Sequence, residues 1–345
     1  MKKLIVAVAA MALLAPVAAS AKEMTFASWG GAYQEAIRKA WIVPFTKETG
    51  IKVEEDTGPE TAKIKAMVDT KSVTWDVVTA GGGGLMRGVK LGLFEKITPD
   101  MVKTDHVIPG ARNDYGIPSE IFSTLIGYST KAFPAGGPQP RSFADFWDVT
   151  KFPGKRTLPD KPETVVEAAL LADGVPMDDV YKTLSTEIGL KRALDKIRAL
   201  KPNVAVWWAS GAQPVQALGS GEVVMALGWN GRFQSGIESK LPIAMAWEQQ
   251  IPQVGFFMIP KGAPNKAEAV AFLNYIVKPA NNARLSEFVA YGPVTEQAWE
   301  TIPTARAETL PSTPERLKSA LFLDIAWWAE AGPRVTEAYT AMLKE

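Results

Sequence analysis

The 345-residue sequence lacks cysteine entirely and contains a single histidine, His106. Without cysteine there can be no disulfide, no thiol nucleophile and no lipid-bearing cysteine of the kind that anchors a lipoprotein. One histidine is too few for a zinc site built from several Cys or His ligands. The motif G-x-S-x-G, which positions the serine of many Ser-His-Asp hydrolases, is also missing. We therefore predict no catalytic residue and no metal-binding residue.

An excess of one charge is missing too. The chain has 38 basic and 37 acidic residues, and without Lys2 and Lys3 at its start 36 basic residues face 37 acidic ones. No block of lysine and arginine stands out, so the sequence lacks the electrostatic footprint of a nucleic-acid partner. Acidic residues are plentiful enough for paired-carboxylate catalysis, but no pair stands out. We expect no enzymatic activity, no cofactor and no nucleic-acid partner.

One long apolar run is present, and it lies at the N-terminus. Lys2 and Lys3 precede the alanine-rich run Leu4–Val17, and the small residues Ala19-Ser20-Ala21 follow it. This order is typical of a secretory signal peptide, residues 1–21, cleaved after Ala21. The alternative, a transmembrane anchor, needs roughly 18 to 20 apolar residues. A protein released without an anchor is retained only in a closed compartment, so we predict a periplasmic location.

The remaining chain exceeds the usual size of a single hydrophobic core, so two domains are expected. Strands and helices alternate along it, which predicts an α/β fold with parallel sheets. The first set has strands at Met24–Ser28, Ile51–Glu55 and Asp76–Ala80 and helices at Tyr33–Glu48, Thr61–Thr70 and Leu85–Leu91. The second has strands at Thr124–Ser129, Arg156–Leu158, Val204–Trp207 and Val223–Trp229 and helices at Glu163–Ala172, Leu190–Leu200 and Ala212–Leu218. Further helices are expected at Ala267–Val277, Ala280–Phe288 and Leu321–Leu343.

The eleven tryptophans suggest ligand capture. Trp29, Trp207-Trp208 and Trp229 stand at predicted strand ends, where α/β sheets bind ligands. An aromatic side chain there can wall an apolar or cationic ligand. The alternative is that these are core residues packed under loops. Trp327-Trp328 is interpreted as a packing anchor on the last helix.

A run of four glycines, Gly81–Gly84, lies between a predicted buried strand and a helix. No Gly-Lys-Ser/Thr follows it, so it is not a phosphate-binding P-loop. Backbone N–H groups at such a helix start can nevertheless bind an anion, and we predict Gly82, Gly83 and Gly84 as ligand-binding residues. The alternative is a flexible turn without a ligand.

The order of these features resembles that of the spermidine/putrescine-binding proteins of ABC importers. The resemblance covers nearly the whole chain after Ala21 and is carried by Phe45–Val53, Trp75–Val78, Gly228–Gly231 and Tyr291–Pro293. It implies the two-lobed periplasmic binding protein fold of type II, in which each lobe is a mostly parallel sheet flanked by helices and the ligand lies in the cleft between them. By resemblance, lobe one comprises residues 22–126 and 258–302, and lobe two residues 127–257 and 303–345.

The resemblance also implies partners and an aromatic site. The partners are a small-molecule ligand and the permease and ATPase of an ABC importer, and we expect a monomer. The aromatic wall of the family falls on Trp29, Tyr33, Trp229 and Tyr291, with Tyr33 one residue further from Trp29 than in the family. Arg232 follows Trp229 closely and is added as a candidate.

The acidic part of the family's site is not kept. Two family acids fall on Lys161 and Thr164, with Asp160 and Glu163 each displaced by one residue. A family aspartate falls on Gly255, and the tryptophan beside it on Gln253. We keep Asp160, Lys161, Glu163 and Gln253 as less certain ligand-binding residues.

These losses bear on the identity of the ligand. A buried diammonium ligand needs fixed negative partners. We therefore predict a different solute, an amino acid derivative or another small organic acid, with its carboxylate at the glycine run near Lys161 or Arg232. Polyamine binding stays open, because a shift of one residue in the alignment would restore Asp160 and Glu163.

Overall fold

The computed structural model describes residues 22–108 and 111–345, so the predicted signal peptide lies outside it. The described strands form one eight-stranded sheet in the order β2-β1-β3-β8-β4-β7-β5-β6. The strands are β1 (Glu23–Ser28), β2 (Lys52–Thr57), β3 (Val77–Gly81), β4 (Ile117–Ser129), β5 (Arg156–Pro159), β6 (Val204–Trp208), β7 (Met225–Trp229) and β8 (Ile243–Met258). None of the described helices is long and apolar enough to cross a membrane.

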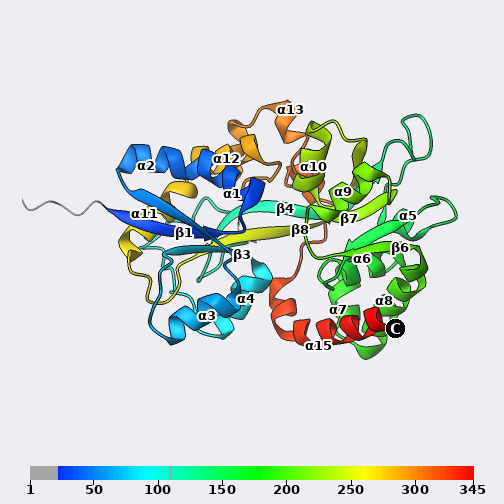
Figure 1. Ribbon diagram of the computed structural model, residues 1–345, viewed down its shortest axis with the longest axis horizontal. Coiled ribbons are helices and arrows are strands. Elements are labelled where there is room, and N and C mark those ends of the chain that lie inside the picture. The colour runs from blue at the N-terminus through cyan, green and yellow to red at the C-terminus, as the bar shows by residue number, and fades with distance from the viewer. Residues whose placement is uncertain (1–21, 109–110) are drawn as a thin grey trace, which may run out of the picture.

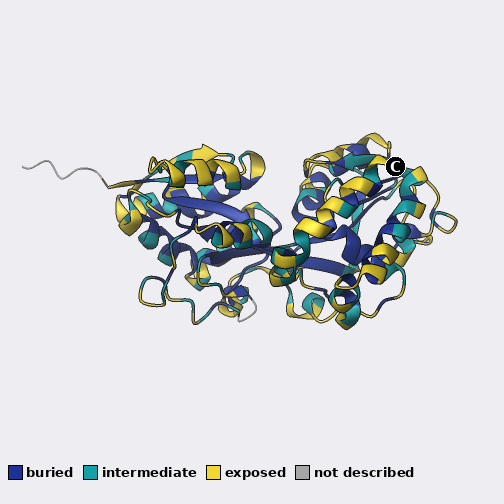
Figure 2. Cartoon of the chain, turned by 90° about the horizontal axis from the view of Figure 1, so that it is seen from below, coloured by how far each residue is buried: buried dark blue, intermediate teal, exposed yellow. Residues whose placement is uncertain are grey.

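The sheet passes through two lobes (Figure 1). Lobe one contains the parallel strands β1, β2 and β3. Lobe two contains the parallel strands β5, β6 and β7. Figure 2 shows the lobes as two masses with a narrower middle, with buried residues along the strands and exposed residues on the outer helices. This architecture confirms the predicted two-lobed α/β fold.

Helices cover both faces of the sheet in each lobe. In lobe one these are α1 (Gly31–Ile37), α2 (Val43–Thr49), α11 (Lys266–Ile276) and α12 (Pro279–Phe288) on one face and α3 (Thr61–Asp69) and α4 (Gly82–Lys90) on the other. In lobe two these are α9 (Gln213–Ser220) and α10 (Asn230–Glu238) on one face and α5 (Phe143–Trp147), α6 (Val165–Ala172), α7 (Val180–Leu184), α8 (Glu187–Leu200) and α15 (Ile325–Lys344) on the other. The short helices α13 (Thr304–Ala307) and α14 (Pro314–Leu317) precede α15.

The two long antiparallel strands, β4 and β8, join the lobes. In lobe one, β8 also pairs with β3, and in lobe two β4 pairs with β7. The predicted lobe boundaries at 126/127 and 257/258 fall within these strands, and the division of the chain into lobes at those residues stays a prediction. A third segment lies along β8, because the N–H groups of Leu321 and Leu323 donate to the carbonyls of Gln250 and Pro252.

The predicted elements differ from the structure at the crossing, at helices α5, α7 and α10, which were not predicted, and at the last helix. That helix begins at Ile325 rather than Leu321, because residues 321–323 extend along β8. The predicted strand Thr124–Ser129 is only the second half of β4, and β8 was not predicted at all. Helix α4 begins at Gly82, inside the glycine run, rather than at Leu85. The predicted first helix is confirmed over Gly31–Thr49, with one π-helical stretch (η1, Arg38–Ile42), and Gly50 ends it with a φ of 74° in the left-handed region that glycine favours.

Candidate functional site

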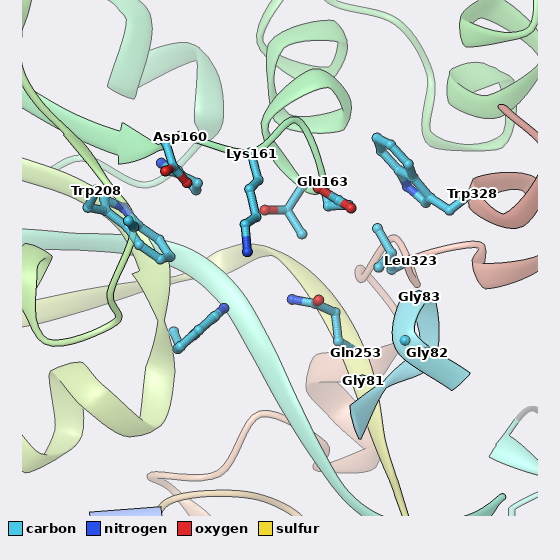
Figure 3. A pocket seen from close by; sticks show the side chains of 15 residues that line it. Gly81, Gly82, Gly83, Asp160, Lys161, Glu163, Trp208, Gln253, Leu323 and Trp328 are labelled. Carbon is cyan, nitrogen blue, oxygen red and sulfur yellow. The ribbon is translucent and has the colours of Figure 1, made fainter. Parts of the chain in front are cut away.

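A cavity of about 210 Å³ lies between the lobes (Figure 3). Its lining comes from the start of α4, the turn before α6, the ends of β6 and β7, the middle of β8 and the segment leading into α15. It brings together eight of the predicted site residues: Gly82, Gly83, Gly84, Asp160, Lys161, Glu163, Trp229 and Gln253.

On the lobe-one side, the glycine run presents backbone rather than side chains to the cavity. A Cβ atom at Gly81 or Gly83 would meet nothing within 4 Å, so the space above both is open. Gly82 instead faces Ile325 of α15, and a Cβ atom there would lie 2.1 Å from the Ile325 Cγ2 atom. The first N–H groups of α4 have no partners within the helix and carry partial positive charge, which favours an anion.

On the lobe-two side, the turn between β5 and α6 contributes polar groups. Thr164, the residue before α6, is buried with a φ of 69°, an unusual backbone conformation for a residue other than glycine. The backbone N–H of Asp160 donates to the Trp208 carbonyl at 2.9 Å. Within the described residues, Asp160, Lys161 and Glu163 form no ion pair, so their charges are available to a solute.

Aromatic rings wall the cavity on the lobe-two side. The rings of Trp208 and Trp229 meet nearly perpendicularly, at 82°, with centroids 5.4 Å apart. Trp328, from α15, adds a third ring. Edge-to-face rings of this kind form an apolar surface that accepts methylene groups and can stabilise a cation over a ring face.

Four of the predicted residues lie outside the cavity lining. Trp29 is half exposed, whereas Tyr33 and Tyr291 are buried and Arg232 is partly buried. The two tyrosines are nevertheless linked to Trp229 through Phe122. The centroid distances are 6.0 Å for Tyr33–Tyr291, 5.5 Å for Tyr291–Phe122 and 6.2 Å for Phe122–Trp229. An aromatic row thus leads from α1 across β4 to the cavity.

The C-terminal segment was missed as a source of lining residues. Leu323 and Trp328 both line the cavity. Trp328 is also a packing residue, as predicted, because it belongs to the lobe-two core. Its indole nitrogen donates to Glu167 Oε1 at 2.7 Å. Since this segment reaches the cleft only through tertiary packing, no local pattern indicated it.

Two glutamates near the cleft are buried. Glu120 of β4 is 3% exposed, and Glu167 of α6 is fully buried. Burial raises the pKa of Glu120 to about 7, against the opposing effect of neighbouring hydroxyl groups. Burial also raises the pKa of Glu167 to about 7, although Trp328 and Tyr181 donate to it. Neither residue was among the sequence candidates.

Across residues 22–108 and 111–345, no group of three or more His, Asp or Glu side chains is placed to hold a metal ion. The single histidine, His106, makes its contact with the carbonyl of Val277 in lobe one, away from the cavity lining.

The chain is similar to proteins named for binding small solutes. The "Gamma-aminobutyric acid-binding protein" of Pseudomonas aeruginosa is 36% identical over 96% of this chain and 94% of its own. The structure of MotA from A. tumefaciens, in complex with glucopine, matches with a TM-score of 0.85 at 36% identity, covering 93% of this chain and 99% of that one. A spermidine/putrescine-binding periplasmic protein of Escherichia coli is 26% identical over 75% of each chain.

A family model covers most of the sequence. The model described as "Bacterial extracellular solute-binding protein" matches residues 40–312. That range includes the glycine run, the turn before α6, Trp229 and Gln253, and ends before α15. Taken with the full-length relatives, the match shows that the chain belongs to the bacterial extracellular solute-binding protein family.

Proposed function

We propose that this protein is the periplasmic substrate-binding component of an ABC importer and that it captures an amino acid derivative between its lobes. The observation that carries the proposal is the cavity itself, which combines a helix start on one lobe with acidic and aromatic groups on the other. A permease and an ATPase would read the closed, liganded form. In this role the protein binds its solute without catalysing a reaction.

The polarity of the cavity supports a zwitterionic solute. The open backbone at Gly81 and Gly83 favours a carboxylate, with Lys161 close enough to line the same space. Asp160 and Glu163 favour a cationic nitrogen, and Trp208 and Trp229 would cover the chain between the two ends. Two relatives named above bind, by their titles, γ-aminobutyrate and glucopine, which are compounds of this class.

Polyamine binding is the second candidate. Asp160 and Glu163 both line the cavity, so two carboxylates are available for a diammonium ligand. Against it, the polyamine-binding relative is more distant than the γ-aminobutyrate-binding one. Lys161, on the same turn, would repel a second ammonium group.

The proposed mechanism is closure of the lobes around the solute. Residues 22–126 and 258–302 would move as lobe one, and residues 127–257 and 303–345 as lobe two. Ligand contacts to both lobes favour the closed form over the open one. The proposed site residues are Gly82, Gly83, Gly84 and Trp229, together with Asp160, Lys161, Glu163 and Gln253. The aromatic row of Tyr33, Tyr291 and Phe122 adjoins Trp229.

A thermal-shift screen tests the proposal. One panel holds amino acids and small carboxylates, and the other holds di- and polyamines. A ligand at about a thousand times its Kd stabilises the folded state by roughly 4 kcal/mol, a shift in Tm on the order of 8 to 16 °C for a protein of this size. A shift with polyamines alone would overturn the ligand class, and a shift with neither panel would overturn the binding role as stated.

The variant Trp229→Ala tests where the solute lies. Removing this ring should weaken solute binding at least about tenfold, because an aromatic wall of the cavity is lost. The matched control is Trp247→Ala, since Trp247 also lies next to the crossing but packs under the Arg316 guanidinium, outside the cavity. Unchanged affinity in Trp229→Ala would show that the solute binds elsewhere.

A further inference from the structure

Glu120 owes its position to an irregularity in β4. Pro118 pairs with Phe256 and Glu120 pairs with Gly255, so Ser119 is an extra residue in the ladder. Asn282 of α12 donates to the Ser119 carbonyl at 2.8 Å and so satisfies the displaced backbone. Without the extra residue, Glu120 would point to the opposite face, because successive side chains alternate. The irregularity therefore turns Glu120 onto the face that carries Gly255.

That face forms the floor of the cavity. Phe122 pairs with Gln253 two residues further along, and Gln253 lines the cavity. On the other side of β8, Gly255 pairs with Gly81, which also lines it. Directly opposed residues of an antiparallel pair lie on one face of the sheet. Gln253, Gly81 and Glu120 therefore lie on the same face of the sheet, around Gly255.

Glu120 is buried beneath the cavity lining, and the two glycines place no side chain over its carboxylate. A Cβ atom at Gly255 would lie 2.1 Å from Glu120 Oε1, so the carboxylate occupies the space that a side chain there would take. Above Gly81 the space is open. Gly255 and Gly81 themselves therefore contribute no side chain between the carboxylate and the cavity.

The carboxylate has an incomplete set of partners. The Tyr33 hydroxyl donates to Oε1 at 2.6 Å. The second oxygen, Oε2, is buried without a hydrogen-bond partner among the residues that the structure describes. Other groups near the carboxylate are Tyr291, which follows α12, and the Ser119 hydroxyl, which lowers the pKa of Glu120 but makes no well-formed hydrogen bond within the described residues. A buried carboxylate oxygen without a donor is costly.

We propose that Glu120 binds a cationic nitrogen of the solute through Oε2, at the edge of the open space above Gly81. An ammonium or guanidinium N–H would complete the hydrogen bonding that the protein leaves open, and its charge would offset that of the carboxylate. A metal ion would need several oxygen ligands, and one carboxylate does not supply them. The inference rests on the proposed solute-binding function and adds to it that Glu120, which is not among the residues lining the cavity, binds the cationic nitrogen of the solute.

Isothermal titration with matched solutes tests the inference. The probes are 4-aminobutyrate, 5-aminovalerate and putrescine, each compared with its N-acetylated counterpart, in which the cationic nitrogen is neutral. At least one amine should bind at least about tenfold more tightly than its N-acetyl form. Glu120→Gln should remove at least about tenfold of that affinity, and the control Glu167→Gln should change it by less than about twofold.

A second readout separates binding from a structural role. Because burial raises the pKa of Glu120 to about 7, binding of a cation near pH 7 should release a proton. Titrations in buffers of different ionisation enthalpy measure that release, and it should be absent in Glu120→Gln. Tyr33, Ser119 and Tyr291 lie near the same carboxylate, so Tyr33→Phe should alter the release without abolishing it.

The results that would overturn this inference differ from those that would overturn the proposed substrate-binding function. Equal binding of an amine and its N-acetyl form, or undiminished amine affinity in Glu120→Gln, overturns the inference while leaving solute binding intact. Binding of a solute without any cationic nitrogen, and of no amine, also overturns it and leaves the substrate-binding function standing. Absence of any binding overturns both.

Discussion

Glu120 and Glu167 are both buried carboxylates with one oxygen unpartnered in the described structure, yet their surroundings differ. Glu167 accepts two hydrogen bonds on Oε1, from Trp328 at 2.7 Å and from the Tyr181 hydroxyl at 3.2 Å. Glu120 accepts one, from Tyr33, and faces two glycines at the cavity floor. Glu167 thus connects elements of one lobe, whereas Glu120 has one donor and lies against residues without side chains.

The comparison shows that burial and a raised pKa do not by themselves indicate a ligand site. The Tyr181 hydroxyl also accepts a hydrogen bond from the backbone N–H of Asp324 at 2.8 Å. Glu167, Tyr181 and Trp328, called the Glu167 group below, therefore fix the C-terminal segment to lobe two. What distinguishes Glu120 is the absence of side chains at Gly81 and Gly255. The following experiments separate the two roles.

The largest effect is expected at the Glu167 group. Trp328→Ala should lower the free energy of unfolding by about 4 kcal/mol, because a buried ring is removed and Glu167 loses its closest donor. Urea denaturation measures this loss. Trp327→Ala, at the neighbouring half-buried ring, is the control and should cost less. Equal losses would mean that Glu167 is not the reason Trp328 matters.

The next effect is a pH dependence of stability without ligand. For both glutamates the folded-state pKa is about 7, above the ordinary 4.5, so the folded state binds the proton more tightly. Their contribution is therefore full below about pH 4.5 and is lost as the pH rises through 7. The loss is on the order of 3 kcal/mol for each residue. Denaturation curves between pH 5 and 8 measure it, and each Glu→Gln variant should remove its own share.

A bound ligand should change this pH dependence of stability. A saturating amine that binds Glu120 favours its charged form, so the part of the pH dependence due to Glu120 should disappear, while the part due to Glu167 stays. The same denaturation series with and without 4-aminobutyrate or putrescine, whichever binds, measures the change. An unchanged pH dependence in the liganded protein would place the two glutamates in the same structural class.

The smallest effect is expected from the tyrosine donors. Tyr33→Phe removes the hydroxyl that donates to Glu120 and should cost about 1 kcal/mol of stability. It should also raise the pKa of Glu120 above 7, because the hydroxyl favours the charged form. Tyr181→Phe should move the pKa of Glu167 less, since Trp328 still donates to it. Urea denaturation at several pH values reports both changes, and a larger shift in Tyr181→Phe would reverse the comparison.

Local patterns predicted the elements that local interactions determine. Alternating strands and helices, the glycine at the end of the first helix and the cavity residues around Gly82–Gly84 and Trp229 could all be read from short stretches. Strand β8 could not, because Pro252 and the polar run Glu248–Gln250 weaken its alternation, and its stability comes from pairing with distant strands.

Glu120 was missed for a related reason. By resemblance, a family aspartate falls on Gly255, so we predicted that a carboxylate of the site was lost there. In the structure a carboxylate occupies that space, but it comes from the paired strand. The one signal available was an acid, Glu120, within an otherwise apolar and hydroxyl-rich strand, and nothing in the sequence indicated its register with Gly255.

The shared strands have a consequence for how the chain folds. In lobe one, β8 lies between β3 and β4, so Val78 pairs with Met258 and Ile121 with Val254. During folding the lobe-one sheet cannot be completed until these late residues are in place, and β3 keeps an open edge meanwhile. Such distant pairings slow folding and prolong exposure of unpaired strands. The lobes therefore mature together, as one cooperative unit, rather than one after the other.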